Sequence, residues 1–339
     1  MARAWQDRIY SETLPWTELV RAGTRELLRR YRLELVLAVR PWDLVALPSV
    51  ARALRDAEVP LSIWPMLEDE KGRWINVHNA REFRSFVLTA CDAMGDTPPV
   101  DVLFDLEPPF DRAKALIALA MRSHTLEGIS RFAAELGKPA GAPFEAAASE
   151  LARTGAEVRA RGITTSAAVW PLVALDAPRG DGWQSLLGTP TDALGASHVS
   201  VMMYTSIFEG WSRGTVRRRD ARALLAAAAV RTATRWSERA GISLGCVGIG
   251  AFADEPTYRE PAELADDVAV ARAAGVSRLT LFDLGGVMSR GPAEAWLDAF
   301  TATDKDAGPL SPQTSKRVRA ARAIARAATW AVSARRVPA

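Results

Sequence analysis

Short apolar runs of strand length alternate with longer helical patterns along the whole chain, and this alternation limits the possible folds most. The runs span residues 7–13, 33–39, 61–67, 100–106, 163–170, 198–204, 243–249 and 277–284. Most of them are continuously apolar, which is typical of parallel strands covered on both faces. Eight strand-then-helix units predict an α/β fold of the (β/α)8 TIM-barrel type.

The first run, residues 7–13, is short and polar, and the barrel depends on it. Without it, an open doubly wound sheet would be the alternative. The nucleotide-binding forms of that sheet open a helix with GxGxxG or GxxxxGK[ST], and neither pattern occurs in this sequence. The 339 residues suit a barrel of about 250 residues with insertions, so we predict a single domain over residues 1–339.

Two segments exceed the basic barrel plan. Residues 108–161, between the fourth and fifth strands, hold two helical patterns where one would suffice. We predict a helical insertion there that forms either a substrate wall or a plain hairpin. Residues 313–336 carry seven Lys and Arg residues among apolar ones and predict a basic C-terminal helix. We expect it to pack on the outer ring of the barrel, the alternative being a membrane surface.

Composition and charge exclude several classes of protein. With 48% apolar residues the chain can bury a large core, and a net charge of +3 does not indicate a nucleic-acid surface. Two distant cysteines and three histidines predict neither a disulfide framework nor a metal finger. We therefore expect no cofactor, no metal, no nucleic-acid partner and no membrane association. The start of the chain lacks a secretory pattern, which favours the cytoplasm.

The sharpest candidate site ends the fourth strand, in the segment VDVLFDLE. In a barrel, the carboxyl ends of the strands carry the active site. Asp105 and Glu107 lie two residues apart, so both should face the barrel interior. Two close carboxylates raise the pKa of one of them, which yields the protonated acid that glycosidic cleavage needs. The alternative is a structural ion pair between Asp105 and Arg40.

Other strand ends add residues that could bind a substrate. Tyr204 ends the sixth strand, where its hydroxyl could orient a substrate or simply belong to the core. Tryptophan faces stack on sugar rings, and several of the 11 tryptophans follow strands. His198 begins the sixth strand, at the opposite end of the barrel, and is therefore excluded from catalysis. The predicted substrate-binding residues are Arg40, Trp64, Glu68, Trp170 and Asp283.

These strand ends resemble those of the family 18 glycoside hydrolases, which are chitinase-like (β/α)8 barrels. Their fourth strand carries DxxDxDxE, in which Glu107 matches the acid and Asp105 the last Asp, whereas Leu103 and Val100 replace the other two. Their sixth strand reads Met-x-Tyr-Asp, and here Thr205 follows Tyr204. Their eighth strand often ends in Trp, whereas this chain has Phe282-Asp283.

The resemblance implies an enzyme of carbohydrate metabolism that cleaves or rearranges a glycosidic bond in a small-molecule or oligosaccharide substrate. In it, Glu107 would protonate the leaving oxygen, Asp105 would stabilise developing positive charge, and Tyr204 would orient the substrate. One alternative is a sugar isomerase or epimerase that binds a divalent metal through Glu107, Asp283 and Glu68. Another is a carbohydrate-binding barrel without catalysis.

Overall fold

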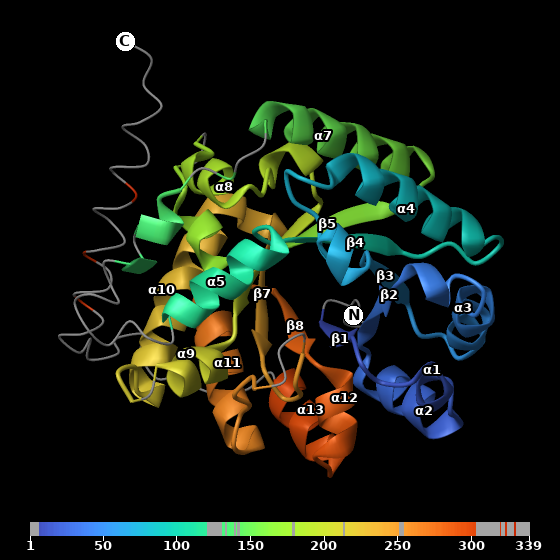
Figure 1. Ribbon diagram of the computed structural model, residues 1–339. Coiled ribbons are helices and arrows are strands. Elements are labelled where there is room, and N and C mark those ends of the chain that lie inside the picture. Colours follow the sequence, from blue (N-terminus) through green and yellow to red (C-terminus); the bar gives the residue numbers. More distant parts are fainter. Residues whose placement is uncertain are drawn as a thin grey trace.

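Eight parallel strands form a closed barrel in the computed structural model (Figure 1), which confirms the predicted fold class. The structure describes residues 7–302 apart from 121–130, 133, 139, 141–142, 178–179, 213 and 251–253, and beyond them only residues 319, 323 and 329. The predicted helix over residues 313–336 therefore lies almost wholly outside the described residues. The strands are β1 Arg8–Ser11, β2 Glu34–Val39, β3 Leu61–Pro65, β4 Asp101–Leu106, β5 Thr164–Val169, β6 His198–Met203, β7 Ala240–Gly245 and β8 Arg278–Phe282.

The polar first run does form the strand that closes the barrel. In β1, Arg8 is aligned with Glu34 of β2 on one side and with Thr280 of β8 on the other. All four residues of β1 are buried. Its polar side chains are tolerated inside because Arg8 forms ion pairs with Glu34 at 2.9 Å and Asp101 at 3.2 Å.

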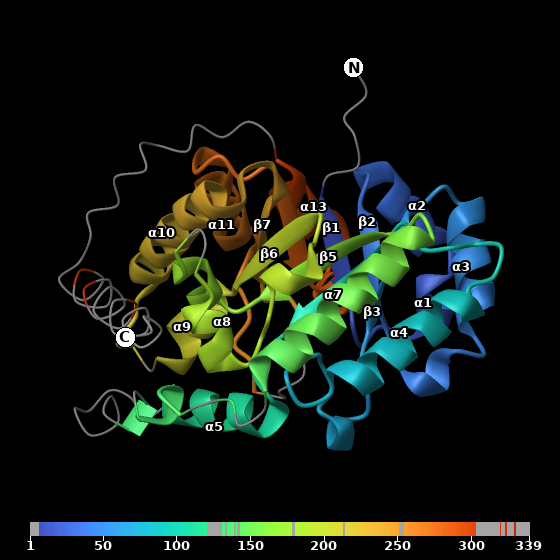
Figure 2. The same ribbon diagram turned by 90° about the horizontal axis from the view of Figure 1, so that it is seen from above.

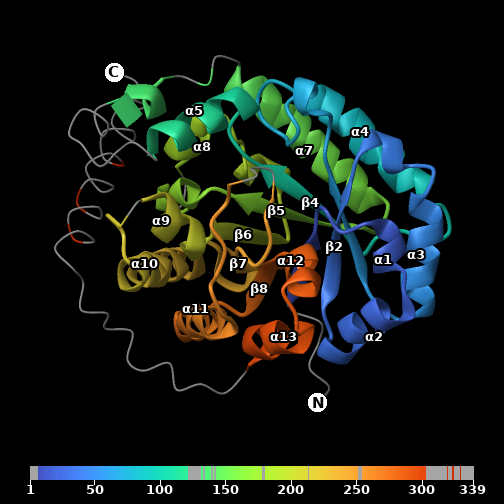
Figure 3. The ribbon, with the colours of Figure 1, turned by 60° about the horizontal axis from the view of Figure 1, so that its bottom comes forward.

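Helices surround the strands and bury their outer faces, as the end-on view shows (Figure 3). Apolar side chains fill the layer between strands and helices; for example, the rings of Phe83 and Phe104 pack 6.3 Å apart. Each large side chain buried in this way contributes about 1.5–3 kcal/mol. The longer helices of this ring are α2 Ala22–Tyr31, α3 Leu47–Asp56, α4 Ala80–Ala93, α7 Phe144–Ala160, α10 Arg218–Trp236, α11 Pro261–Ala273 and α13 Ala293–Thr301.

Shorter helices follow the strands at their carboxyl ends. They are α1 Trp16–Leu19, α8 Gly182–Leu187, α9 Thr205–Trp211 and α12 Leu284–Ser289. In the part of the chain that the structure describes, no helix has both the length and the apolar character needed to cross a membrane.

The long connection after β4 contains α5 Phe110–Ala120 and then α7. Helix α7 belongs to the outer ring beside α4, where Arg84 pairs with Glu157 at 2.5 Å. Helix α5 instead runs across one end of the barrel, next to α8 and α9 (Figure 2). Arg112 ties it there by donating to the backbone carbonyl of Leu186 at 2.6 Å. The extra helix thus lies at the end of the barrel where the strands deliver their carboxyl termini.

Strand β7 begins and ends earlier than the predicted run 243–249. It starts at Ala240 because the pairing with β6 begins there, opposite Val199. It ends at Gly245 because the chain then turns toward β8, and the Val247 amide donates to the carbonyl of Phe282 at 2.7 Å. Both reasons are tertiary and cannot be read from apolar runs.

Candidate active site

The carboxyl end of β4 places the Asp105 carboxyl inside the barrel. Asp105 is only 2% exposed, and the groups that act on it come from other strands and loops of the barrel. Burial raises the pKa of Asp105 well above its usual range, and the nearby carboxylates of Glu107 and Glu12 raise it further. This carboxyl therefore holds a proton more strongly than a solvated aspartate.

Glu107 follows β4 directly and is partly buried beside Asp105. The Trp170 indole Nε1 donates a hydrogen bond to Glu107 Oε2 at 2.6 Å, which holds the carboxyl in one orientation. Burial raises the pKa of Glu107 to about 7, although the Trp170 hydrogen bond opposes the rise. A group that is half protonated near neutral pH is suited to proton transfer.

Asp105 Oδ1 and Trp64 Nε1 are both buried and lie near each other, and the Trp64 indole N–H acts on the Asp105 carboxyl and opposes the rise of its pKa. Trp64 is 5% exposed and packs against Tyr10, with ring centroids 5.1 Å apart. Buried polar atoms are normally satisfied, and this donor and this carboxyl can satisfy each other.

Arg40 does not form the structural pair with Asp105 that was the alternative to a functional role. Its guanidinium instead lies 3.5 Å from Glu12 and stacks over the ring of Trp42 at 5.7 Å. Among the described residues, Asp105 therefore keeps no arginine partner within ion-pair distance.

Tyr204 directly follows β6 and lies partly buried over the same end of the barrel. Its ring packs on Phe282 at 5.5 Å and also lies against Gly245, where a Cβ would come within 2.9 Å of the ring. Burial raises the pKa of the Tyr204 hydroxyl well above its usual value, so this hydroxyl stays protonated and can donate a hydrogen bond.

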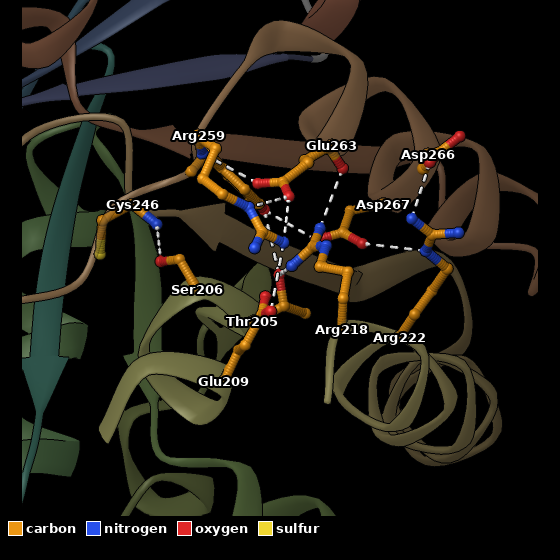
Figure 4. Close-up of polar contacts among 11 residues, drawn as sticks. Thr205, Ser206, Glu209, Arg218, Arg222, Cys246, Arg259, Glu263, Asp266 and Asp267 are labelled. Carbon is orange, nitrogen blue, oxygen red and sulfur yellow. Dashed lines mark hydrogen bonds and ion pairs between the residues drawn. The ribbon is translucent and has the colours of Figure 1, made fainter. Parts of the chain in front are cut away.

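The two residues after Tyr204 are anchored by a network that Figure 4 shows. The Thr205 hydroxyl accepts from Arg218 at 2.7 Å and donates to the buried carboxylate of Asp267. The Ser206 hydroxyl accepts from the Cys246 amide at 2.7 Å. The resembled family has Asp at position 205, whereas here Thr205 points into the helical layer and the carboxylate comes from α11.

Glu68 and Asp283 have other partners. Glu68 lies in the loop after β3 and pairs with Lys71 at 3.4 Å. Asp283 caps α12 by accepting from the Gly286 amide at 3.0 Å, and burial raises its pKa to about 6. Across the described residues, no three His, Cys, Asp or Glu side chains gather closely enough to hold a metal ion. The proposed ligand set of Glu107, Asp283 and Glu68 therefore does not form.

The structure adds two charged residues to the site predicted from the sequence. Glu12, just after β1, has a side chain that is 4% exposed, and Arg73 lies 3.2 Å from it. Burial raises the pKa of Glu12 to about 7, and both Arg73 and Arg40 oppose the rise. Glu12 could be found as a polar strand end, but Arg73 lies in the charged loop EDEKGR, where nothing in the sequence distinguishes one base from another. We call the group Glu12, Asp105, Glu107, Trp170 and Tyr204 the barrel mouth.

The chain was compared with family models, curated proteins and solved structures. No family model and no curated protein matches the sequence. Among solved structures, the glycoside hydrolase domain of PgaB (BpsB) from Bordetella bronchiseptica is similar over 88% of this chain and 99% of its own, with a TM-score of 0.52 and 11% identity. A chitinase from Chromobacterium violaceum covers 88% of this chain and 99% of its own at a TM-score of 0.47 and 13% identity. The 3-keto-D-glucoside 4-epimerase from E. coli covers 87% of this chain and 97% of its own at a TM-score of 0.45 and 9% identity.

The likeness to the PgaB domain identifies the architecture. The chain has a TIM-barrel fold like that of a glycoside hydrolase domain. At 11% identity this similarity is one of fold, and a fold of this kind carries many unrelated activities. The function has to be argued from the barrel mouth.

Proposed function

We propose that this protein is a glycoside hydrolase in which Glu107 is the acid that protonates the leaving oxygen. One observation carries the proposal. Glu107 has its pKa raised to about 7 by burial, and Trp170 fixes its carboxyl through a 2.6 Å hydrogen bond at the carboxyl end of a barrel strand. Glycosidases need an acid that still holds its proton near neutral pH.

Asp105 would act beside Glu107 as the second carboxyl group. It would stabilise the positive charge that develops on the sugar as the glycosidic bond breaks. Its carboxyl lies inside the barrel beside Glu107, which supports this role. Substrate binding that brings positive charge toward Asp105 would favour its ionised form and leave the proton on Glu107.

The remaining residues of the site would bind and orient the sugar. Tyr204 would donate a hydrogen bond to a substrate oxygen, and Trp64 would contact the sugar beside Asp105. Arg40 would shape the rim beside Glu12. Glu68 and Asp283 would contribute to the walls of the site, since each is engaged by neighbouring residues.

The test is turnover of a panel of aryl glycosides and oligosaccharides by the wild type and by Glu107→Gln. We expect the variant to lose roughly two to four powers of ten in rate on whichever glycoside the wild type cleaves, because that is the usual share of a positioned acid. Glu70→Gln, at an exposed carboxylate of the same rim, serves as the control and should keep wild-type turnover.

Three other outcomes would contradict the proposal, and two of them favour another function. Wild-type turnover by Glu107→Gln would remove Glu107 from the mechanism. Turnover that EDTA abolishes would revive the metal-dependent isomerase or epimerase. Saturable binding of an oligosaccharide without any turnover would make the protein a carbohydrate-binding barrel.

A further inference from the structure

Arg73 is held in place by an unusually complete set of contacts for a loop residue. Its guanidinium forms a two-pronged contact with Asp69, at 2.8 Å from Nε and 3.0 Å from Nη2. Its remaining nitrogen, Nη1, reaches Glu12 at 3.2 Å, and the side chain is only 12% exposed. A planar guanidinium that is satisfied on two sides in this way has a fixed position as well as a charge.

The backbone around Arg73 is equally constrained. Its carbonyl accepts from the Leu67 amide at 2.7 Å, and two residues later Ile75 donates to the Asp105 carbonyl at 3.1 Å. Between them, Trp74 donates to the carbonyl of Pro108 at 2.9 Å, just after Glu107. This loop therefore connects the ends of β3 and β4, while its arginine reaches across to β1.

Arg73 also has a φ of 52°, in the left-handed region, where residues other than glycine are strained. Strain of this kind persists only when surrounding contacts demand it, and it concentrates at functional sites. The contacts just described supply that demand. The fold thus holds Arg73 in a strained backbone conformation. Its side chain lies between Glu12, just after β1, and the two carboxyl groups at the end of β4.

Charged and polar groups surround Glu107 from several elements. Glu255 lies in the loop after β7, and Glu12 lies just after β1. Arg73 lies in the loop after β3, and the indole of Trp170 lies just after β5. Asp105 is its neighbour on β4.

Glu12 is surrounded in turn by a similar set of charges. Arg73 and Arg40 are its positive neighbours, and Glu255 and Asp283 are its negative ones. Arg73 is therefore the arginine that acts on both Glu12 and Glu107.

We propose that Glu12 and Arg73 form a positioning charge pair that sets how tightly Glu107 holds its proton. The inference rests on the proposed role of Glu107 as the acid. In this arrangement Glu12 favours the protonated form of Glu107 and Arg73 favours the ionised form. The two act on Glu107 with opposite sign, and Glu12, whose own pKa is about 7, is only partly ionised when Glu107 titrates.

The experiment is a pH titration of side-chain carboxyl carbons by NMR in the full chain labelled with 13C-glutamate, with the Glu107 signal assigned from Glu107→Gln. In Arg73→Gln the Glu107 midpoint should rise by roughly half a pH unit, because the loss of a nearby positive charge is partly offset as Glu12 becomes harder to ionise. In Glu12→Gln it should fall by roughly half a unit or more, because a negative charge is lost and Arg73 is released toward Glu107. The double variant should return near the wild-type midpoint.

Arg29→Gln is the matched control, since it removes an arginine from an exposed ion pair with Glu26 on α2 and should leave the midpoint unchanged. If Arg73→Gln does not fold, the isosteric Glu12→Gln variant decides alone. A midpoint that stays fixed or moves upward in Glu12→Gln overturns the proposal, as does one that stays fixed or moves downward in Arg73→Gln. The titration needs no substrate, so it can succeed even if no glycoside is cleaved, and the two proposals can fail separately.

Discussion

At the scale of single residues, one indole N–H limits how far burial changes the strand-4 acid. Burial and the surrounding carboxylates raise the pKa of Glu107, whereas the hydrogen bond from Trp170 lowers it, with a net value of about 7. Trp170 was predicted to bind substrate through its ring face. The structure shows its edge bonded to Glu107, so its effect on the acid is electrostatic as well.

Trp170→Phe should therefore shift the pH dependence of activity. Loss of the indole donor removes a bond that favours the ionised carboxylate, so the pKa of Glu107 should rise by roughly 1 unit. An acid catalyst works while it is protonated, so the basic limb of kcat/KM against pH should move to higher pH by the same amount. Trp296→Phe instead loses an indole bond to the carbonyl of Arg290, and its basic limb should stay where the wild type has it. A basic limb that moves to lower pH in Trp170→Phe would contradict this account.

At the scale of elements, a buried carboxylate joins three helices behind the barrel mouth. Asp267 of α11 is fully buried and accepts hydrogen bonds from Arg218 of α10 at 2.7 Å and from Tyr258 at 2.8 Å (Figure 4 shows the arginine). Thr205, the first residue of α9, donates to the same carboxylate. This network anchors the chain immediately after Tyr204, so packing in the helical layer determines where that hydroxyl lies.

Asp267→Asn should destabilise the fold strongly, by on the order of 3 kcal/mol, because it leaves the Arg218 guanidinium without its buried counter-charge. The neighbouring Asp266 forms an ion pair with Arg222 at 2.7 Å but is half exposed. Asp266→Asn should therefore cost less than about 1 kcal/mol. Urea unfolding of the two variants measures both free energies, and equal losses at the two positions would show that the network does not stabilise the helices.

At the scale of the whole molecule, closing the barrel buries a polar layer at the end opposite to the mouth. Arg8 forms ion pairs there with both Glu34 and Asp101, and His198 lies close to Gly241. His198 is 1% exposed, and neither ring nitrogen has a hydrogen-bond partner among the residues that the structure describes. Burial lowers the pKa of His198 well below its usual value, and the charge of Arg8 lowers it further.

This histidine should make the folded state less stable in acid. Below about pH 6.5 the unfolded chain binds a proton at this position that the folded chain does not, so unfolding becomes easier as the pH falls. The slope from one such group is roughly 1.4 kcal/mol per pH unit. Comparison with His198→Phe isolates the effect, because the buried carboxyls of the mouth contribute equally to both proteins.

The measurement is the free energy of unfolding between pH 5 and pH 8 for both proteins. The difference between them should be constant above about pH 7.5 and should shift in favour of His198→Phe as the pH falls below about 6.5. A difference that stays constant over the whole range would mean that His198 accepts its proton in the folded state.

Much of the fold could be predicted from local pattern. Continuous apolar runs located β2, β3 and β4 to within a residue or two, because strands covered on both faces must be apolar throughout. The run that became β7 was misplaced, since its start depends on pairing with β6 opposite Val199. Of the site, the spacing of Asp105 and Glu107 predicted two side chains on one face, and the structure brings them together inside the barrel.

The sequence by itself determined the order of strands and helices and the strand end that carries the acidic pair, because these depend on periodicity along the chain. Only the tertiary structure decided which charges face that pair. Arg73 comes from a loop, Glu12 from the first strand and Trp170 from the fifth, and closure of the barrel brings them to Glu107. Electrostatic interactions act through space and fall off with distance, so the proton affinity of Glu107 depends on neighbours whose proximity no local pattern encodes.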